Sequence, residues 1–378
     1  MLKFKVAVLT SAHTAKDIRI FHKQCVSLAK AGYDVNLIVP STEAGWHDGV
    51  KILPVERYSS RLKRMTLTVW RIFSLAVKLK ADIYHFHDPE LIPIGLLLRA
   101  MGKKVIYDVH EDAPATVLSK QYLWKPLRQP ISKCLHWLES TAVRRFSAVI
   151  PVTLKIAERF KHHPHCVVVR NYPMPHEFTM SDDVDWGTRQ NSAAYVGGIS
   201  EARGIRQMVE AITCLPQEFL GQFKVLELAG GFLSTTLRDE IIKLPGWSYA
   251  NEHGVVGRAE VAHILANARV GLVVLHPTPN HLHSLPIKLF EYMSSGIPVV
   301  ASDFPLWREI IEAAGCGILV DPFDTQAIAS AMQYLFEHPA EAEKMGQQGR
   351  DAVRSHYNWG QQEAQLLKLY SDLLQGKK

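Results

Sequence analysis

The stretch from Ser284 to Ser302 (SLPIKLFEYMSSGIPVVAS) carries residues suited to binding an anionic substrate. Pro286 fits the first turn of a helix, where the missing amide hydrogen is no loss. The free amides of Ile287–Leu289, with the ammonium group of Lys288, therefore predict a diphosphate site. Glu291 lies one turn further on, and its carboxylate can accept two hydrogen bonds from a ribose. The alternative is that Lys288 and Glu291 are solvated charges on a surface helix.

A second stretch, from Tyr195 to Ala211 (YVGGISEARGIRQMVEA), combines glycines with a cation. Gly197 and Gly198 follow a strand-like run, and glycine lets the backbone approach a phosphate closely. Arg203 stands at the start of a helix and can hold phosphate oxygens with two hydrogen bonds. By itself this stretch also fits an ordinary connection between a strand and a helix.

The N-terminal half places histidines and carboxylates after its predicted strands. His13, His87 and Asp88 follow two such runs, and His110 follows the run KKVIYD after one further residue. We therefore expect His110 to contact a substrate, although a histidine that only supports the site is the alternative. Glu111, the next residue, fits the capping and orientation of its own loop.

These residues need elements that bring them together, and the sequence predicts parallel sheets wrapped by helices. Ligands of such sheets bind beyond the carboxyl ends of the strands, which is where the polar residues fall. Two series of strands predict two doubly wound α/β domains with a cleft between them, joined by a polar linker from Pro173 to Asn191. The predicted strands are Phe4–Thr10, Val35–Val39, Ile83–His85, Lys104–Tyr107, Ala148–Ile150, Val167–Val169, Ala193–Val196, Val225–Leu228, Gly271–Leu275, Pro298–Ala301 and Gly317–Val320.

The combination of motifs resembles the retaining glycosyltransferases of family four, which have the GT-B architecture of two Rossmann-like domains. In the C-terminal half, the resemblance rests on PIKLFEYMSSGIPVVAS, VGGISEARG and HGVVGRAEVAHILANARVGLVVLHP. In the N-terminal half, AHTAKDIRIFHKQCVSLAKAGYDV, HFHDPELIPIGLLLRAMGKKVIYDVHED and VVVRNYP are similar to that family. The resemblance implies an acceptor-side domain over residues 1–175 and a donor-binding domain over 190–357. A terminal helix, residues 358–378, would cross back onto the first domain.

Carried over to this sequence, the resemblance assigns a role to individual residues. Glu291 would hold the donor ribose, while Arg203 and Lys288, with the amide of Leu289, would hold the diphosphate. His110 would lie beside the reacting sugar or the acceptor, and it joins Arg203 and Lys288 as a catalytic candidate. The remaining donor-side candidates are Gly197, Gly198, Val255 and His276, and the acceptor-side candidates are His13, Arg19, His87, Asp88 and Glu111.

The sequence departs from the family pattern at two positions. His283 stands where family members often place a sugar-binding glutamate, and Gly198 stands where an arginine is common. These departures leave the donor sugar and part of the phosphate clamp open. The resemblance implies a hexosyl transfer from a nucleotide-diphosphate sugar to a saccharide or lipid-linked acceptor, in cell-surface polysaccharide or glycolipid synthesis. A sugar-nucleotide epimerase of the same architecture and a non-catalytic nucleotide-sugar-binding partner are the alternatives.

We expect no metal and no cofactor, because cations and a helix N-terminus can neutralise a leaving diphosphate. The one D-x-D string, Asp183–Asp185, lies in the linker. His85, His87 and Asp88 imitate a metal site but offer too few ligands for zinc. Retention of configuration, which the resemblance implies, would use front-face attack assisted by the departing phosphate.

The segment from Tyr58 to Lys80 (YSSRLKRMTLTVWRIFSLAVKLK) is basic and amphipathic and contains no acidic residue. It predicts docking on anionic lipid, whereas a packed helix with a solvated basic face is the alternative. Its cations are Arg61, Lys63, Arg64, Arg71, Lys78 and Lys80.

The overall composition fits a globular protein of 378 residues with 47% hydrophobic residues, 21% charged residues and a net charge of +6. Five scattered cysteines fit reduced thiols in the cytoplasm, and no apolar run is long enough to span a bilayer. We therefore expect a cytoplasmic protein, peripheral on the inner face of the cell membrane, that does not bind nucleic acid.

Overall fold

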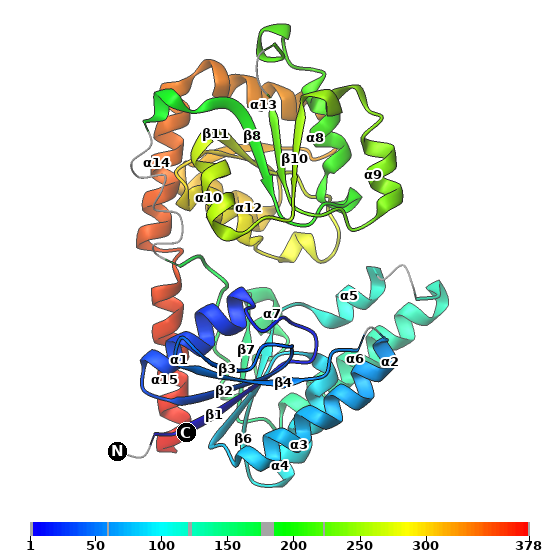
Figure 1. Ribbon diagram of the computed structural model, residues 1–378, viewed down its shortest axis with the longest axis vertical. Coiled ribbons are helices and arrows are strands. Elements are labelled where there is room, and N and C mark those ends of the chain that lie inside the picture. Colours follow the sequence, from blue (N-terminus) through cyan, green and yellow to red (C-terminus); the bar gives the residue numbers. More distant parts are fainter. Residues whose placement is uncertain (1–2, 59, 120–122, 175–184, 222–223, 377–378) are drawn as a thin grey trace. The chain divides into compact units, whose positions relative to one another are not determined.

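A computed structural model describes residues 3–58, 60–119, 123–174, 185–221 and 224–376. The chain divides into two compact units (Figure 1). The first comprises Met1–Asn171 and Trp359–Lys378, and the second comprises Tyr172–Asn358. The terminal segment from Trp359 thus belongs to the N-terminal unit, and the boundary after Asn171 falls close to the predicted position 175.

The N-terminal unit is built on a seven-stranded sheet in the order β3-β4-β2-β1-β5-β6-β7. All neighbouring strands are parallel except β3 and β4, which form an antiparallel pair at one edge. The order reverses at β1, which pairs with β2 on one side and with β5 on the other. The strands are β1 (Lys5–Leu9), β2 (Asp34–Pro40), β3 (Gly45–His47), β4 (Val50–Val55), β5 (Ile83–Phe86), β6 (Lys104–Val109) and β7 (Ala148–Pro151).

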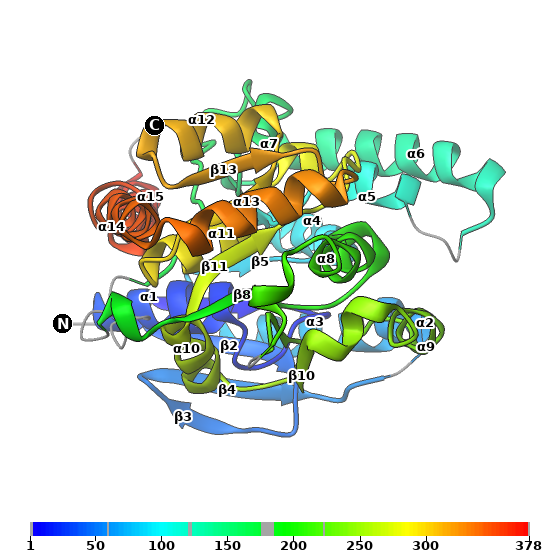
Figure 2. The same cartoon turned by 90° about the horizontal axis from the view of Figure 1, so that it is seen from above.

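Helices cover both faces of this sheet (Figure 2). The wide, π-type helix η1 (Ile18–Cys25) and α1 (Val26–Lys30) connect β1 to β2, and Asp17 caps η1 through the amides of Arg19 and Ile20. Helices α3, α4 and α6 connect successive strands from β4 to β7 and contact one another in that order. The helical segments are α2 (Arg61–Lys63), η2 (Arg64–Thr68), α3 (Val69–Leu79), η3 (Pro89–Leu91), α4 (Ile92–Ala100), α5 (Ala113–Ser119), α6 (Lys125–Val143) and α7 (Leu154–Glu158).

The last helix, α15 (Trp359–Gln375), packs on the N-terminal unit against η1. The indole nitrogen of Trp359 donates to the Ser27 hydroxyl at 2.9 Å, and Tyr370 is fully buried. The Tyr370 hydroxyl lies 2.8 Å from Nδ1 of His85, at the centre of the sheet. The terminal helix is therefore part of the N-terminal core.

The C-terminal unit has a six-stranded parallel sheet in the order β10-β9-β8-β11-β12-β13. Here the order reverses between β8 and β11. The strands are β8 (Gln190–Val196), β9 (Leu226–Ala229), β10 (Ala250–Gly254), β11 (Ala268–Val273), β12 (Val299–Ser302) and β13 (Gly317–Val320). The helical segments are η5 (Trp186–Thr188), η6 (Glu201–Arg203), α8 (Ile205–Ile212), η7 (Gln217–Phe219), α9 (Thr235–Ile241), η8 (Pro245–Tyr249), α10 (Arg258–Asn267), η9 (His281–His283), α11 (Ile287–Ser294), α12 (Pro305–Ala314), α13 (Thr325–Glu337) and α14 (Pro339–Ser355).

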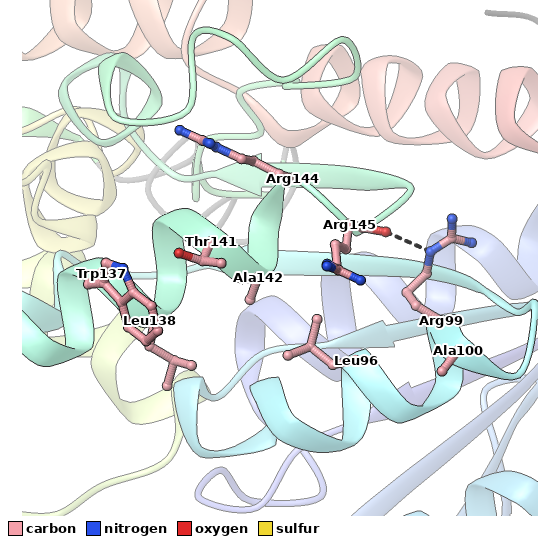
Figure 3. Close-up of a pocket in the computed structure, with 9 residues that line it drawn as sticks. All are labelled: Leu96, Arg99, Ala100, Trp137, Leu138, Thr141, Ala142, Arg144 and Arg145. Carbon is pink, nitrogen blue, oxygen red and sulfur yellow. Dashed lines mark hydrogen bonds between the residues drawn. The ribbon is translucent and has the colours of Figure 1, made fainter.

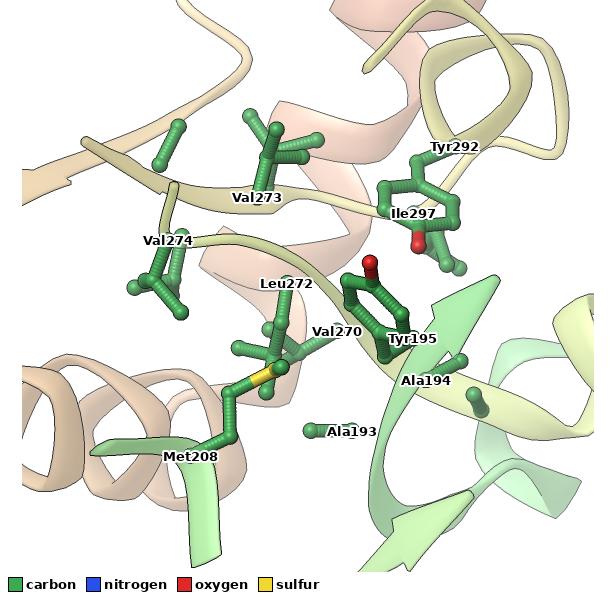
Figure 4. Close-up of a cluster of buried hydrophobic side chains, with 14 of the residues drawn as sticks. Ala193, Ala194, Tyr195, Met208, Val270, Leu272, Val273, Val274, Tyr292 and Ile297 are labelled. Atoms are coloured by element: carbon green, nitrogen blue, oxygen red, sulfur yellow. The ribbon is translucent and has the colours of Figure 1, made fainter. Parts of the chain in front are cut away.

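Buried side chains from both faces of this sheet hold the helices in place (Figure 4). Val270 and Leu272 are fully buried, as is Tyr195 on the adjacent strand. Gly271 has no room for a side chain, because a Cβ there would lie 2.2 Å from the ring of Tyr292. The Tyr292 hydroxyl accepts a hydrogen bond from the amide of Val196 at 2.8 Å. This packing fixes α11 against the end of β8.

The predicted strands mostly match the observed ones, with one error and several omissions. Val167–Val169 was predicted as a strand, which is wrong: its amides donate to β7, but only an isolated bridge at Cys166 forms. The strands β3, β4 and β10 were missed: β3 and β10 lack an apolar run, and Pro54 interrupts the run of β4. The predicted linker lies partly outside the described residues, as do Asp183 and Val184 of the D-x-D string. Asp185 caps the amide of Gly187.

Candidate active site

A pocket of about 370 Å³ opens in the C-terminal unit where β8 ends and α11 begins. It lies at the reversal of the strand order, which is where open parallel sheets bind ligands. Gly197, Arg203, Lys288 and Glu291 all line it, so the structure brings together the core of the predicted donor site. Gly197 has a φ of +116°, and a Cβ there would lie 3.5 Å from Nζ of Lys288. The positive φ, rather than a lack of space, therefore favours glycine at this position.

Lys288 places a buried ammonium group at the start of α11. Its Nζ lies 3.5 Å from the ring centroid of Tyr195 and has no hydrogen-bond partner among the described residues. Burial, reinforced by the guanidinium of Arg203, holds the pKa of Lys288 well below its usual value. A buried cation without a partner is costly in the free protein, because its lost hydration is not replaced. An anionic ligand in the pocket would supply the missing partner.

Arg203 contacts the loop at Gly198, which is one of the two departures from the family pattern. Its Nη1 donates to the carbonyl oxygen of Gly198 at 2.8 Å. A Cβ at position 198 would lie 2.8 Å from that same nitrogen, which is too close. The guanidinium of Arg203 thus occupies the space that a side chain at position 198 would need.

Glu291 is held by a residue that the sequence reasoning missed. Its Oε1 accepts a hydrogen bond from Nη1 of Arg258 at 2.7 Å, and its side chain is only 6% exposed. Arg258 is the first residue of α10 and also lines the pocket. The contact with Arg258 therefore orients the buried carboxylate before any ligand arrives. The available signal for Arg258 was a cation at a helix start within HGVVGRAEVAHILANARVGLVVLHP, a stretch that resembles the family.

Several predicted donor residues lie outside this pocket lining. The amide of Leu289 already donates to the carbonyl of Pro286 at 3.1 Å, so it is not free for a phosphate. Val255 is 86% exposed, and His276 is engaged by the side chain of Gln207 at 2.8 Å. Asn280, His281 and Ser284 line the pocket instead and were not predicted.

The N-terminal unit gathers its polar residues around the buried carboxylate of Asp108, at the end of β6. Nη2 of Arg19 donates to both oxygens of Asp108 at 3.0 Å, and Nε2 of Gln24 donates to one at 2.5 Å. Although burial opposes it, the charge of Arg19 holds the pKa of Asp108 well below its usual value. Arg19 is 3% exposed. It was predicted as an acceptor-side residue, and the structure places it as a buried partner of Asp108.

His110 and His87 form a hydrogen-bonded pair above Asp108. Nδ1 of His87 lies 2.8 Å from Nε2 of His110, so one ring donates and the other accepts. Burial lowers the pKa of His110 to about 4 although Asp108 opposes the effect, and burial also lowers the pKa of His87. Both imidazoles are consequently neutral near pH 7. His110 retains an accessible edge, with 18% of its side chain exposed, whereas His87 is buried.

His13 belongs to the loop that follows β1, and Asp88, which follows β5, is hydrogen-bonded to that loop. Oδ2 of Asp88 accepts from the Thr10 hydroxyl and from the amide of Ser11, both at 2.7 Å. His13 stacks on His110 with ring centroids 5.2 Å apart. Burial would lower the pKa of His13, but its hydrogen bond to Asp17 and the charge of Asp88 raise it. Asp88 thus shapes the loop, and His13 is the member of the histidine group whose pKa is raised.

Glu111 and the candidate metal ligands have structural partners. The carboxylate of Glu111 accepts from the Thr116 hydroxyl at 3.2 Å, in agreement with the expected orienting role in its loop. The ligand atoms of His85, His87 and Asp108 lie within 4.8 Å of one another. Asp108 takes the place expected for Asp88 in this group, and its oxygens are already bonded to Arg19 and Gln24. Metal-independent chemistry remains a prediction.

Two family models match adjacent parts of the chain. The model described as "Glycosyl transferases group 1" matches residues 178–352, and the "Glycosyl transferase 4-like domain" matches residues 19–172. Together they span both units and all of the pocket residues described above.

The chain belongs to the glycosyl transferases of group 1.

Curated relatives of this glycosyltransferase include an alpha-D-kanosaminyltransferase of Streptomyces kanamyceticus, 23% identical over 74% of this chain and 73% of the relative. The D-rhamnosyltransferase WbpZ of Pseudomonas aeruginosa is 21% identical over 73% and 69% of the two chains. A phosphatidyl-myo-inositol mannosyltransferase of Mycobacterium leprae is 34% identical, but over 23% of each chain. These relatives are all named as transferases of a sugar.

Solved structures show that this glycosyltransferase has the two-domain GT-B fold. Sucrose-phosphate synthase from Thermosynechococcus elongatus matches with a TM-score of 0.78, at 17% identity over 99% of this chain and 100% of the other. WaaG, a glycosyltransferase of lipopolysaccharide biosynthesis, matches with a TM-score of 0.72, at 15% identity over 96% and 99%. Anabaena HepE in complex with UDP matches with a TM-score of 0.71, at 14% identity over 98% and 100%.

Proposed function

We propose that this glycosyltransferase moves a hexose from a nucleotide-diphosphate sugar to a saccharide or lipid-linked acceptor, with retention of configuration and without a metal. The observation that carries the donor assignment is the buried ammonium of Lys288, which has no hydrogen-bond partner among the described residues and faces a pocket shared with Arg203. The diphosphate would lie against these two cations and the first amides of α11. The ribose would lie against Glu291.

The charges in the pocket support a metal-independent reaction. Developing negative charge on a leaving diphosphate needs fixed positive groups in a site that excludes water. Lys288 and Arg203 are two such groups, and the N-terminus of α11 adds a partial positive charge. Glu291 is the one carboxylate among the described residues lining the pocket, and Arg258 holds it. No lining residue is thus placed as a carboxylate nucleophile, in accord with front-face attack.

His110 is the proposed contact to the acceptor or the reacting sugar. Its low pKa leaves the imidazole neutral at physiological pH, so it can donate one hydrogen bond and accept another. The hydrogen bond to His87 ties its Nε2 and fixes the ring orientation. We assign His110 a role in positioning a hydroxyl group, with the departing phosphate taking the proton.

Synthesis of a surface polysaccharide or glycolipid is supported by the relatives, among which an inositol-lipid mannosyltransferase and a lipopolysaccharide glycosyltransferase are named. No helix in the described ranges is long and apolar enough to cross a membrane. We propose a peripheral, cytoplasmic enzyme. Trp70 is 64% exposed on α3, but Arg64 and Arg71 of the same segment pair with Glu90 and Glu56. These pairs remove two of the six cations from the predicted docking segment.

The proposal is tested by calorimetric titration with UDP, GDP, dTDP and CMP, with and without EDTA. We expect one nucleoside diphosphate to bind with the same affinity in EDTA, because the protein itself supplies the positive charges. Loss of binding in EDTA that Mg²⁺ restores would contradict the metal-independent site. No binding of any nucleoside diphosphate would contradict the donor assignment.

Turnover separates the transferase from the two alternatives. With the matching sugar nucleotide and no acceptor, a transferase should leave the sugar configuration at C2 unchanged, whereas an epimerase would invert it. A non-catalytic binding protein would neither transfer nor slowly hydrolyse the bound donor. Proton NMR of the anomeric signal in a transfer product would report retention directly.

A further inference from the structure

A groove of about 590 Å³ runs between α4 and α6 on one face of the N-terminal sheet (Figure 3). Leu96, Leu138 and Ala142 form an apolar floor. Trp137 stands at its rim and is 67% exposed. Exposed side chains of this size are costly to leave in water, so a contiguous apolar groove indicates a binding surface.

One end of this groove is cationic. Figure 3 shows the guanidinium groups of Arg99 and Arg145 beside Leu96 and Ala100. Nε of Arg99 donates to the carbonyl oxygen of Arg145 at 2.7 Å, and this hydrogen bond joins the C-terminal end of α4 to the segment that follows α6. Arg144 also borders the groove. In the described part of the chain, neither Arg144 nor Arg145 forms an ion pair with a carboxylate, so both charges are available to an anion.

The two helices carry no exposed carboxylate. Helix α4 contains no acidic residue, and α6 contains only Glu139. Glu139 is buried and accepts from the hydroxyl of Tyr107 at 2.8 Å and from Arg159. The groove therefore differs from the α2–α3 segment, where Glu56 and Glu90 neutralise cations. Its charge complements an anion, and its floor complements a hydrocarbon chain.

The groove is separate from the site around His110. Arg99 and Arg145 lie just before the first residues of β6 and β7, whereas His110 follows the last residue of β6. A strand of six residues spans about 20 Å, so the cationic end lies at the opposite edge of the sheet. Occupancy of the groove consequently need not compete with an acceptor at His110.

We propose that this groove binds one anionic phospholipid of the membrane surface, with an acyl chain along the floor and the phosphate at Arg144 and Arg145. The site extends the membrane contact proposed above and is independent of the transfer reaction. Exposed Leu127 and Ile131, one turn apart on α6, continue the apolar surface beyond the groove. A soluble phosphate would leave this apolar surface uncovered, and a nucleic acid would gain little from an aliphatic floor.

The test is cosedimentation of the full chain with phosphatidylglycerol–phosphatidylcholine vesicles and with pure phosphatidylcholine vesicles. We compare wild type with Arg144→Glu/Arg145→Glu and with the matched control Lys63→Glu/Lys78→Glu, which changes the net charge equally on α2 and α3. Each cation at an anionic surface contributes about fivefold to partitioning. We expect the arginine variant to lose at least about tenfold on the anionic vesicles and considerably more than the lysine control. Circular dichroism and the midpoint of urea denaturation report that both variants remain folded.

Each outcome decides between the two proposals. Equal losses in both variants would overturn the groove and leave a general electrostatic contact. A loss confined to the lysine variant would place the contact on α2 and α3, and no binding to either vesicle would overturn both proposals. If inorganic phosphate binds at Arg145 and thereby prevents vesicle binding, the ligand of the groove would be a soluble phosphate instead. Phosphatidylglycerol with brominated acyl chains should quench the tryptophan fluorescence of the wild type, and this quenching should be smaller in Trp137→Phe. Equal quenching of the two proteins would contradict an acyl chain in the groove.

Discussion

Lys288→Met should raise the stability of the ligand-free protein and weaken donor binding. Methionine fills a similar volume and removes the ammonium group, which lies buried 3.5 Å from the ring of Tyr195 without a hydrogen-bond partner among the described residues. An unsatisfied buried donor costs about 1–3 kcal/mol, and the contact with the ring offsets about 1 kcal/mol. The free energy of unfolding of the ligand-free variant should therefore rise by up to about 2 kcal/mol.

The same substitution should weaken binding of a nucleoside diphosphate. Removing one partner of a buried charge pair costs about 2–5 kcal/mol, which corresponds to a loss in affinity of about 30-fold or more. Because the pKa of Lys288 is lowered in the free protein, an arriving diphosphate should raise it and bind together with a proton. The wild type should take up part of a proton at a pH above that lowered pKa, and the variant should take up none.

The sign of the pH dependence follows from the same shift. Between the lowered pKa of Lys288 and its usual value, the unfolded chain binds more protons than the native one. The stability of the free protein should therefore rise with pH across that window, and Lys288→Met should lose this contribution. Urea denaturation gives the stability, and calorimetry in buffers of different ionisation enthalpy gives the proton uptake. A destabilised variant that binds nucleotide as tightly as wild type would refute the assignment of Lys288.

Three further predictions concern other residues. Glu291→Gln should lose about 1.5–3 kcal/mol of nucleotide-binding free energy in calorimetry. Arg258→Gln keeps the Glu291 carboxylate and should lose less. Equal losses in the two variants would assign the effect to the ion pair instead of the carboxylate. Tyr370→Phe leaves Nδ1 of His85 without its partner and should lower the free energy of unfolding by about 1 kcal/mol in urea denaturation; an unchanged midpoint would contradict this. Because the pKa of His110 is about 4, the pH profile of kcat/KM should show no ionisation of His110 between about pH 5.5 and 8. A transition near pH 6.5 that disappears in His110→Gln would contradict it.

Much of the architecture could be predicted from local sequence. Apolar runs such as those of β1 and β12 are buried on both faces of a parallel sheet, so their composition alone marks them as strands. Helix α11 begins immediately after Pro286, as the fixed geometry of proline predicts. Gly197, Arg203, Lys288 and Glu291 could be grouped because the carboxyl ends of parallel strands share one edge.

The partners of these residues could not be predicted, because they come from distant parts of the chain. Arg258 at the start of α10 meets Glu291 of α11 only in the folded chain, because the two residues are 33 positions apart in sequence. Arg19 carries the cation expected to face an acceptor, yet the fold buries it against Asp108, where an unpaired carboxylate would be costly.

The sequence thus determined which segments form strands and helices and which residue types gather at the strand ends, because both depend on local pattern and parallel topology. The tertiary structure alone decided which of those side chains are free for a ligand. Lys288 and Arg19 are both buried cations, and only the presence of Asp108 beside Arg19 distinguishes a structural charge from one that awaits a ligand. That distinction depends on neighbours brought together from distant positions, and no local pattern records them.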